Sequence, residues 1–241
     1  MYKLRLTDLV KDMRDVSVFG PVLLIALAAS GLWIFLEIGH EVGENEMEAM
    51  DSFILLLFRD PADLSQTMGP AWLKETMVEI TALGGYPVLV LLVSAVIGFL
   101  LVSGRRGPAF FVFLSIVSGS LVSHGLKLVY DRARPDLVEH LVTIHTPSFP
   151  SGHATMSTVV YLTLASLIVR LVEDWRVRIY VMSVAIATAV LIGVSRVYLG
   201  VHWPTDVMAG WAIGAAWASL SWLVVSVLRR LRGKGNPDAG Y

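Results

Sequence analysis

Three short motifs in the second half of the chain combine residue types that can transfer phosphoryl groups. Written as patterns, they are K-x6-R-P, P-S-G-H and S-R-x5-H-x3-D. They supply three cations, two histidines and one carboxylate: Lys127, Arg134, Arg196, His153, His202 and Asp206. Phosphoryl transfer needs positive charge around the equatorial phosphate oxygens, a nucleophile in line with the leaving oxygen, and an acid for that oxygen. The motifs therefore predict phosphoryl transfer through a histidine nucleophile.

The three cations, Lys127, Arg134 and Arg196, are predicted to hold the phosphate. An arginine can direct two N–H bonds at phosphate oxygens, whereas a lysine acts as a point charge. All three lie near the ends of apolar segments, where a charge is costly and marks a functional site. The alternative is that such side chains only reach toward water at the membrane surface, a role that we expect for Arg132.

Ser151 and Gly152 come directly before an apolar segment and are predicted to form the N-terminus of its helix. Serine is a good N-cap, which is a sufficient structural reason for its presence. A helix N-terminus also offers free N–H groups and partial positive charge to an anion. Because Gly152 has no side chain, a phosphate can approach its backbone. We therefore expect this turn to bind phosphate together with the cations.

The two histidines differ in their neighbours, because only His202 has a carboxylate four residues later, at Asp206. If Asp206 accepts a hydrogen bond from Nδ1, the Nε2 atom of His202 is left as a neutral nucleophile. His153 is then predicted to protonate the leaving oxygen and afterwards to activate water. Two alternatives stay open: the histidines exchange roles, or Asp206 only favours the dipole of its helix.

The composition is that of a membrane protein. Of the 241 residues, 55% are hydrophobic and 16% are charged, whereas about 25% are charged in an average soluble domain. The net charge of −1 gives no reason to expect a nucleic-acid partner, and the lack of cysteine excludes disulfides, thiolate catalysis and Cys-based zinc sites. Six apolar segments can cross a bilayer, which takes about 20 residues. They are Val18–Ile38, Thr81–Ser103, Pro108–Tyr130, Ala154–Leu171, Ile179–Tyr198 and Asp206–Leu228.

These segments predict an all-α fold, a polytopic bundle of six transmembrane helices that forms one domain over residues 1–241. Lysine and arginine accumulate in cytoplasmic loops, and 13 of the 19 lie on the side that holds both termini. We therefore expect a multi-pass protein of the plasma (inner) membrane with both termini in the cytoplasm. All three motifs then fall on the opposite, extracytoplasmic face.

Residues 39–80 are expected to lie outside the membrane as short interfacial helices. Apolar residues recur at helical spacing on one face, which is typical of an amphipathic helix on a membrane surface. The first such set is Met50, Phe53, Ile54, Leu57 and Phe58, and the second is Trp72, Leu73, Met77 and Ile80. The segment either forms a rim that guides lipid into the site or is a linker that packs on the spans.

Two weaker features complete the pattern. Gly210 and Gly214 form a G-x-x-x-G sequence in the last span, which lets helices approach closely. We expect it to serve packing inside the monomer rather than a dimer face. Residues 233–241 show no apolar period and are predicted to be a disordered tail.

Together, the three motifs resemble those of the type 2 phosphatidic acid phosphatase superfamily. The match includes every motif position: Lys127, Arg134, Pro135, Pro150, Ser151, Gly152, His153, Ser195, Arg196, His202 and Asp206. The resemblance implies a helical bundle that hydrolyses phosphate esters without a metal, through a phosphohistidine. It implies that His202 is the nucleophile and that His153 is the acid. It also implies a set of phosphate-binding residues: Lys127, Arg134, Ser151, Gly152 and Arg196.

Bacterial membrane members of similar size act on phosphatidylglycerol phosphate, phosphatidic acid or undecaprenyl diphosphate, so we expect a lipid phosphate of this kind as substrate, and no cofactor. Two other functions stay open. The phosphohistidine could pass its group to an alcohol on another lipid, which would make the protein a phosphotransferase, or the basic pocket could bind lipid phosphate without catalysis. The superfamily also contains vanadium haloperoxidases, but these resemble soluble proteins, and six spans argue against that activity. The sequence leaves the oligomeric state open.

Overall fold

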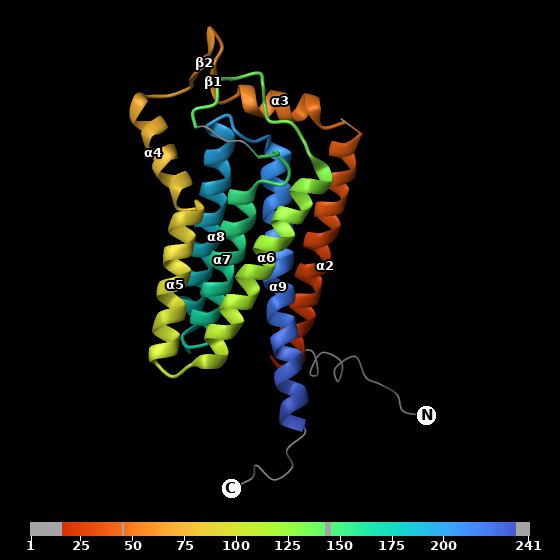
Figure 1. Cartoon of the computed structure of the whole chain (residues 1–241), viewed down its shortest axis with the longest axis vertical. Helices are drawn as coiled ribbons and strands as arrows, with labels where there is room; N and C mark the ends of the chain where they lie inside the picture. Colours follow the sequence, from red (N-terminus) through yellow and green to blue (C-terminus); the bar gives the residue numbers. More distant parts are fainter. Residues whose placement is uncertain (1–15, 45, 143–145, 235–241) are drawn as a thin grey trace.

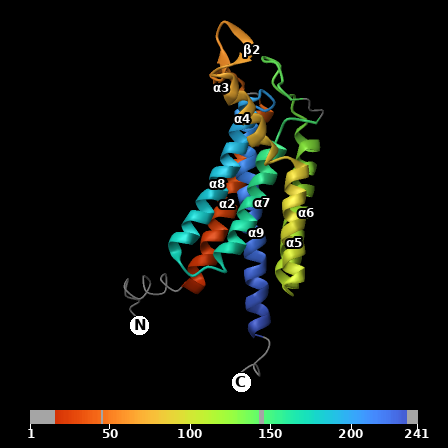
Figure 2. The same cartoon turned by 90° about the vertical axis from the view of Figure 1, so that its left-hand side faces the viewer.

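The computed structural model describes residues 16–44, 46–142 and 146–234, and these fold into a bundle of long helices (Figure 1). The helices are α2 (Val16–Gly43), α3 (Glu48–Leu56), α4 (Ala71–Ala82), α5 (Tyr86–Val102), α6 (Arg106–Tyr130), α7 (Gly152–Val169), α8 (Trp175–Tyr198) and α9 (Pro204–Lys234). Between α3 and α4, strands β1 (Arg59–Asp60) and β2 (Asp63–Thr67) form an antiparallel hairpin. The short elements lie together at one end of the bundle (Figures 1 and 2).

The prediction of six spans is confirmed. Five helices are long and apolar enough to cross a membrane by themselves: α2, α6, α7, α8 and α9. A sixth span results when α4 and α5, whose axes differ by 46°, are taken together as one bent span. The predicted segment Thr81–Ser103 runs across the break between these two helices, so its first residues belong to α4 rather than to α5.

The break between α4 and α5 has a local cause. Gly85 caps α5 in an extended conformation, and Pro87 follows in the first turn. Proline has no N–H to donate to the carbonyl four residues earlier, at Leu83, and its ring clashes with a carbonyl in that position. The hydroxyl of Tyr161 on α7 donates to the Leu83 oxygen at 3.0 Å instead, so the interrupted carbonyl keeps a partner at membrane depth, as it must.

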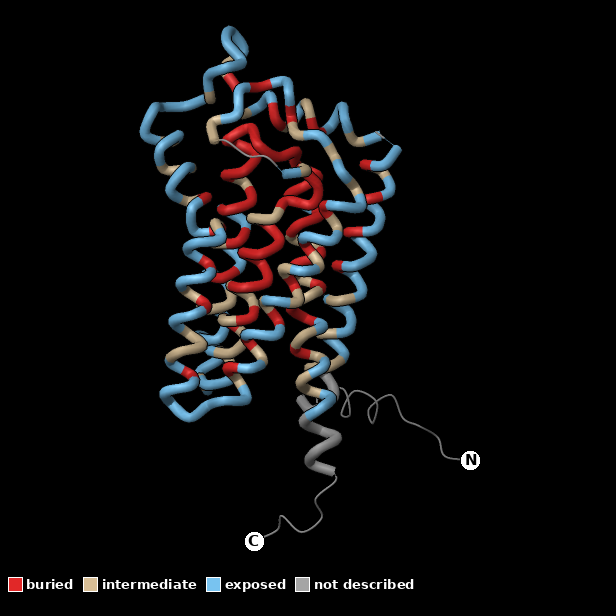
Figure 3. The backbone as a smooth tube through the Cα atoms, viewed as in Figure 1, coloured by how far each residue is buried: buried red, intermediate tan, exposed pale blue. Residues whose placement is uncertain are grey.

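Helix α7 lies at the centre of the bundle. It packs against α6, α8 and α9, and α9 in turn packs against α2. In α7, 56% of the most apolar stretch is buried, compared with 22% in α2 and in α8. Buried residues also gather toward the end of the bundle that carries the short elements (Figure 3). The interior is therefore most tightly enclosed where the three motifs meet.

The glycines of the G-x-x-x-G sequence allow α9 to approach α7. A Cβ atom on Gly210 would lie 2.9 Å from the carbonyl oxygen of Ser151, and one on Gly214 would lie 2.8 Å from that of Thr155. Both distances are too short for any larger side chain. The expected packing inside the monomer is confirmed.

The segment between α2 and α5 is helical as predicted, but two details differ. The hairpin was not expected, because its strands are short and polar. In α3, the buried residues are Asp51 and Leu55, whereas Phe53 and Leu57 are 64% and 55% exposed. Phe53 and Leu57 of the predicted apolar face therefore point away from the protein, whereas Phe58 packs against Tyr198. The buried face of α3 carries a carboxylate.

Two boundaries also shift. Helix α2 continues past Ile38 to Gly43, and α9 continues to Lys234. Gly233 and Lys234, predicted to be disordered, are therefore helical. The rest of the predicted tail, residues 235–241, lies outside the described residues, as do the N-terminal cations used for the topology prediction.

Candidate active site

The three motifs lie at the same end of the bundle, although they come from different parts of the chain. The first follows the end of α6, the second forms the start of α7, and the third links α8 to α9. Helix α3 and the hairpin lie over the same end (Figure 1). The convergence of the motifs on one face, predicted from the loop order, is confirmed.

Lys127 occupies the last turn of α6 and is 9% exposed. Helix α6 ends at Asp131, which adopts the left-handed conformation (φ 40°) that often terminates helices. The Lys127 ammonium donates to the carbonyl of Pro147 at 2.7 Å and to that of Ser148 at 3.5 Å. The Lys127 side chain therefore points into the site and holds the loop residues that lead into the second motif.

Arg134 lies across the loop that carries His202. Its Nε atom donates to the Thr146 carbonyl at 2.8 Å, and Nη1 donates to the Val201 carbonyl. The same Nη1 lies 3.2 Å from Nε2 of His202. Burial lowers the pKa of Arg134 from its ordinary value, yet an arginine stays charged in proteins. A cation thus faces the ring nitrogen predicted to attack phosphate.

Arg196 is buried near the end of α8, with an exposure of 2%. Its Nη1 donates to Thr81 Oγ1 at 3.1 Å, but Nε and Nη2 have no hydrogen-bond partner among the described residues. Leaving a buried donor unpaired costs about 1–3 kcal/mol, and more for a charged group. An anion with several acceptor oxygens is the ligand that would satisfy this open edge of the guanidinium.

The end of α8 aims the next residues into the site. Gly200 adopts φ +75°, its amide donates to the Val197 carbonyl, and the Val201 amide donates to the Arg196 carbonyl. These two bonds form a Schellman motif, which ends a helix and reverses the chain. His202 follows immediately and is 2% exposed.

The contacts of His202 define its tautomer. Nδ1 lies 3.3 Å from Oδ2 of Asp206 and 3.3 Å from the hydroxyl of Ser148. Since Arg134 can only donate, the Nε2 atom that faces it must be the acceptor. The neutral ring therefore carries its proton on Nδ1, where Asp206 accepts it. This arrangement was predicted from the i, i+4 spacing, and it leaves the Nε2 lone pair for an incoming electrophile.

The surroundings keep His202 neutral. Burial lowers its pKa well below the usual 6.5, and the positive charges of Arg134, Arg196 and Lys127 lower it further. His153 contributes in the same direction. A neutral imidazole is the nucleophilic form.

Asp206 is fully buried in the first turn of α9 and has two roles. Its Oδ2 accepts from the backbone amide of Trp203 at 2.9 Å, as in the capping box of a helix N-terminus. The same oxygen accepts from the Ser148 hydroxyl and faces His202. Asp206 can therefore accept a hydrogen bond from His202 and favour the dipole of its helix at the same time, the two roles considered from the sequence.

The start of α7 forms as predicted. Ser151 Oγ accepts from the amide of Ala154 at 3.4 Å, and the Ser151 amide donates to the backbone carbonyl of Asp206 at 2.9 Å. A Cβ atom on Gly152 would lie 3.5 Å from Cε of Lys127. The backbone of Gly152 and the lysine side chain are therefore neighbours. His153, in the first turn of α7, lies beside Gly84 at the break between α4 and α5.

Three participants were missed by reasoning from the sequence. Arg132 does not reach toward water, because its guanidinium bonds to Asp206 at 2.7 Å and to Asp51 at 2.7 Å. Ser148 bonds to the same carboxylate of Asp206. Asp51 shares the first turn of α3 with a second acidic residue, Glu48, so the sequence did not single it out, and the spacing gave no signal for its partner.

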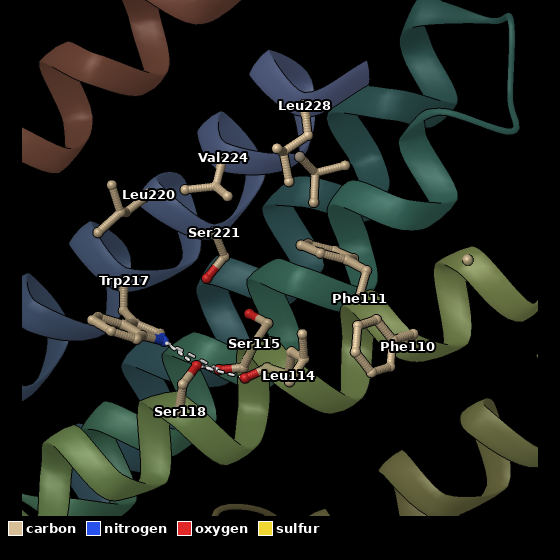
Figure 4. Close-up of a pocket in the computed structure, with 12 residues that line it drawn as sticks. Phe110, Phe111, Leu114, Ser115, Ser118, Trp217, Leu220, Ser221, Val224 and Leu228 are labelled. Atoms are coloured by element: carbon tan, nitrogen blue, oxygen red, sulfur yellow. Dashed lines mark hydrogen bonds between the residues drawn. The ribbon is translucent and has the colours of Figure 1, made fainter. Parts of the chain in front are cut away.

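No three His, Cys, Asp or Glu side chains within the described ranges are grouped so that they could hold a metal ion. The prediction of a metal-independent reaction is therefore left to a test with chelator. A separate cavity of about 470 Å³ lies between α6 and α9 (Figure 4). Its lining is mainly apolar and includes Phe110, Phe111, Leu114 and Leu220. It contains none of the motif residues.

Comparison with known proteins agrees with this site. A model of the PAP2 superfamily matches residues 108–230, a range that contains all three motifs. Phosphatidylglycerophosphatase B of Bacillus subtilis (strain 168) is 31% identical over 186 residues, covering 75% of this chain and 85% of that protein. The lipid A 1-phosphatase of Rhizobium etli is 31% identical over 207 residues, covering 76% of this chain and 84% of the relative.

A solved structure is also similar. The crystal structure of a transmembrane PAP2-type phosphatidylglycerolphosphate phosphatase from Bacillus subtilis superposes with a TM-score of 0.73 at 29% sequence identity. The superposition covers 85% of this chain and 98% of that one. The likeness therefore extends beyond the motifs to most of the helical bundle.

Proposed function

Because this chain belongs to the PAP2 superfamily of membrane phosphatases, we propose that it hydrolyses a phosphate ester or diphosphate on a lipid through a phosphohistidine on His202. The main observation that supports this mechanism is the pair of contacts made by the two ring nitrogens of His202. Its Nδ1 faces Asp206 at 3.3 Å, and its Nε2 faces the cation Arg134 at 3.2 Å. A neutral nucleophile is thus held against a cluster of positive charge.

In the first half of the reaction, the phosphate enters between Arg134, Lys127 and Arg196. Its oxygens pair with the open Nε and Nη2 of Arg196, and Arg134 moves its Nη1 from His202 to the phosphate. Nε2 of His202 then forms a bond to phosphorus while the bond from phosphorus to the lipid oxygen breaks. His153 gives its proton to that oxygen, and the lipid leaves as an alcohol or, from a diphosphate, as a monophosphate.

In the second half, His153 removes a proton from water, and the resulting oxygen attacks the phosphorus of the phosphohistidine. The bond from phosphorus to Nε2 breaks, inorganic phosphate is released, and His202 returns to its neutral form. Throughout both steps, Asp206 stays on Nδ1 and keeps the tautomer fixed. Phosphate, water and the two histidines account for every proton and bond.

The substrates named for the relatives suggest what this chain acts on. We propose phosphatidylglycerol phosphate or undecaprenyl diphosphate, since relatives named for each are similar to it. A site at the edge of the lipid phase is supported by exposed apolar side chains close to it, such as Leu128 of α6, which is 78% exposed and follows Lys127 directly. Lysine and arginine are more frequent on the side that holds both termini, which is expected to be cytoplasmic. This excess supports an extracytoplasmic location for the site, which lies at the other end of the bundle.

The first experiment measures phosphate release from both lipids by purified protein in detergent, with EDTA present. We expect the wild type to release phosphate and His202→Ala to release none. The His153→Ala variant should form the phosphohistidine slowly but should be unable to activate water. After a brief reaction with a ³²P-labelled substrate, quenched without acid, the ³²P label should therefore remain bound to this variant.

The controls separate the parts of this proposal. Full activity in His202→Ala would eliminate the phosphohistidine mechanism, whereas activity abolished by EDTA and restored by a metal would eliminate the metal-free reaction. Label recovered on a second lipid rather than in inorganic phosphate would identify a phosphotransferase. If the wild type binds the lipid phosphates but hydrolyses neither of them, the protein is better described as a lipid-phosphate-binding protein.

A further inference from the structure

Arg132 bridges two carboxylates that lie far apart in the sequence. Its Nη1 donates to Oδ1 of Asp206 at 2.7 Å, and its Nη2 donates to Oδ2 of Asp51 at 2.7 Å. The guanidinium also lies over the ring of Trp203, 5.6 Å from the centroid, a favourable position for a cation. Nη1 of Arg132 also donates to the hydroxyl of Thr205 at 2.8 Å, so four contacts hold this side chain in one place.

Asp51 is held as firmly on its other side. It is fully buried on α3, and its Oδ1 accepts from the backbone amide of Thr205 at 2.9 Å. Its Oδ2 accepts from the Thr205 hydroxyl at 2.5 Å. Thr205 lies in the first turn of α9, where free amides and the helix dipole favour a negative charge. Asp51 thus fixes α3 on the start of α9 and orients Arg132.

The effect of this bridge reaches His202 through Asp206. One oxygen of the Asp206 carboxylate, Oδ1, is occupied by Arg132. The other, Oδ2, accepts from Trp203 and Ser148 and faces Nδ1 of His202. With both oxygens assigned, the carboxylate cannot turn about its own axis. Without Arg132, two buried carboxylates would also remain close together with no cation between them, which is costly.

We infer that Arg132 and Asp51 are positioning residues for the nucleophile: they lock Asp206, and through it the Nδ1 tautomer and direction of His202. This inference rests on the proposed function, in which His202 attacks phosphorus. It gives helix α3 a role in the reaction, which is neither of the two roles considered for it from the sequence.

Removal of Arg132 also changes the electrostatics around His202. The charged or titratable groups that face this ring are Arg134, Arg196, Lys127, His153 and Asp206. Without Arg132, the Asp206 carboxylate loses the cation on its Oδ1, so its negative charge stabilises a protonated His202 more strongly. The pKa of His202 should therefore rise, and the acid limb of kcat/KM, which reports the free enzyme, should move to higher pH.

The kinetic test compares Arg132→Met, Arg132→Lys and Asp51→Asn with the wild type. We expect Arg132→Met to lower kcat about 100-fold, because a displacement near 1 Å costs a factor of this order. KM should change less than about threefold, since Arg132 does not hold the phosphate. Arg132→Lys should recover about a tenth or more of the wild-type kcat, because it keeps the charge but cannot contact both carboxylates as a planar fork.

A second measurement needs no substrate, so it stays informative even if the proposed lipids are wrong. Orthovanadate can accept a histidine nitrogen as a fifth ligand, whereas sulfate occupies an anion site without forming such a bond. The affinities of both anions can be measured from the rise in melting temperature of the protein in detergent. We expect Arg132→Met and Asp51→Asn to weaken vanadate binding about tenfold and to leave sulfate binding within twofold.

Arg59 provides the matched control. It lies on β1, is 1% exposed, and donates to the carbonyl of Tyr198 at 2.8 Å. It therefore also fastens the extramembrane segment to the end of α8, but it has no contact with Asp206 or His202. Whatever its melting temperature, Arg59→Met should neither move the acid limb nor change the ratio of vanadate to sulfate affinity.

Two results would overturn the inference. One is an unchanged kcat and vanadate affinity in Arg132→Met and Asp51→Asn, whatever their melting temperatures. The other is a loss of vanadate selectivity in Arg59→Met equal to that in Arg132→Met, which would mean that these residues only hold the segment in place. If wild-type protein binds vanadate normally but hydrolyses neither lipid, the choice of substrate fails and the positioning role stands.

Discussion

At the scale of single residues, the site contains a buried cation with unused donors. Arg196 is 2% exposed, and two of its three guanidinium nitrogens lack a hydrogen-bond partner within the described ranges. Lys127, in contrast, donates to two backbone carbonyls even without phosphate. The two cations should therefore respond differently to removal, although both face the same anion.

We predict that Arg196→Met lowers kcat/KM by at least about 1000-fold, as is typical when a charged contact to the transition state is lost. Its melting temperature in detergent should equal or exceed that of the wild type, because the buried unpaired donors are gone. Lys127→Met should lose both activity and stability. Thermal unfolding and initial rates measured on the same preparations test this contrast, which a destabilised Arg196→Met would contradict.

His202 links stability to pH. Its pKa is lowered by burial and by the neighbouring cations, chiefly Arg134, so below about pH 6.5 the unfolded chain binds a proton that the folded chain does not. Stability from this group is complete above pH 6.5 and is lost as the pH falls toward the lowered folded value. The melting temperature should therefore decrease from pH 7 to pH 5. His202→Asn should show a shallower decrease; an identical slope would contradict the assignment.

At the scale of helices, the contact between α7 and α9 brings the second motif to the third. Gly210 makes this approach possible, since its Cα faces the Ser151 carbonyl and the Ala154 side chain. Any added atom must push the two helices apart, and the Ser151 amide bonds directly to the Asp206 carbonyl. Packing and catalysis are coupled at this point.

Gly210→Ala should therefore destabilise the protein by about 1–3 kcal/mol, the usual cost of overpacking, and should lower kcat more than tenfold. Gly98→Ala, in α5, is the matched control because nothing lies within 4 Å of an added Cβ atom there. It should be neutral or slightly stabilising, as alanine favours helix. Equal effects of the two substitutions on activity and melting temperature would refute the coupling.

The same scale shows what could be predicted from the sequence. The spans follow from long apolar segments, and the placement of Lys127 and His202 on one face follows from the order of loops. The i, i+4 spacing of His202 and Asp206 was sufficient to predict their contact. The contact of Asp51 with Thr205 spans 154 residues, and no local periodicity can indicate a partner at that separation.

At the scale of the molecule, the motif end and the terminal end of the bundle are opposite (Figure 1). Because the chain has no cysteine, single cysteines can report the side of each end. We expect Ala62→Cys, in the exposed hairpin, to react with a membrane-impermeant maleimide in intact cells whose outer envelope is permeable. Glu173→Cys, exposed between α7 and α8, should react only after lysis. The reverse pattern would place the site in the cytoplasm.

Helix α2 packs against α9, so the first and last spans of the chain are neighbours. During synthesis at about 5–20 residues per second, the start of α9 emerges roughly 10–30 s after the end of α2. Until then, α2 lies in the lipid without α9, its main packing partner. Thr205, to which Asp51 bonds, and Asp206 have not yet been synthesised. Catalytic competence therefore arises only after the start of α9 has been synthesised, and every nascent chain that ends before α9 is an inactive set of separate spans.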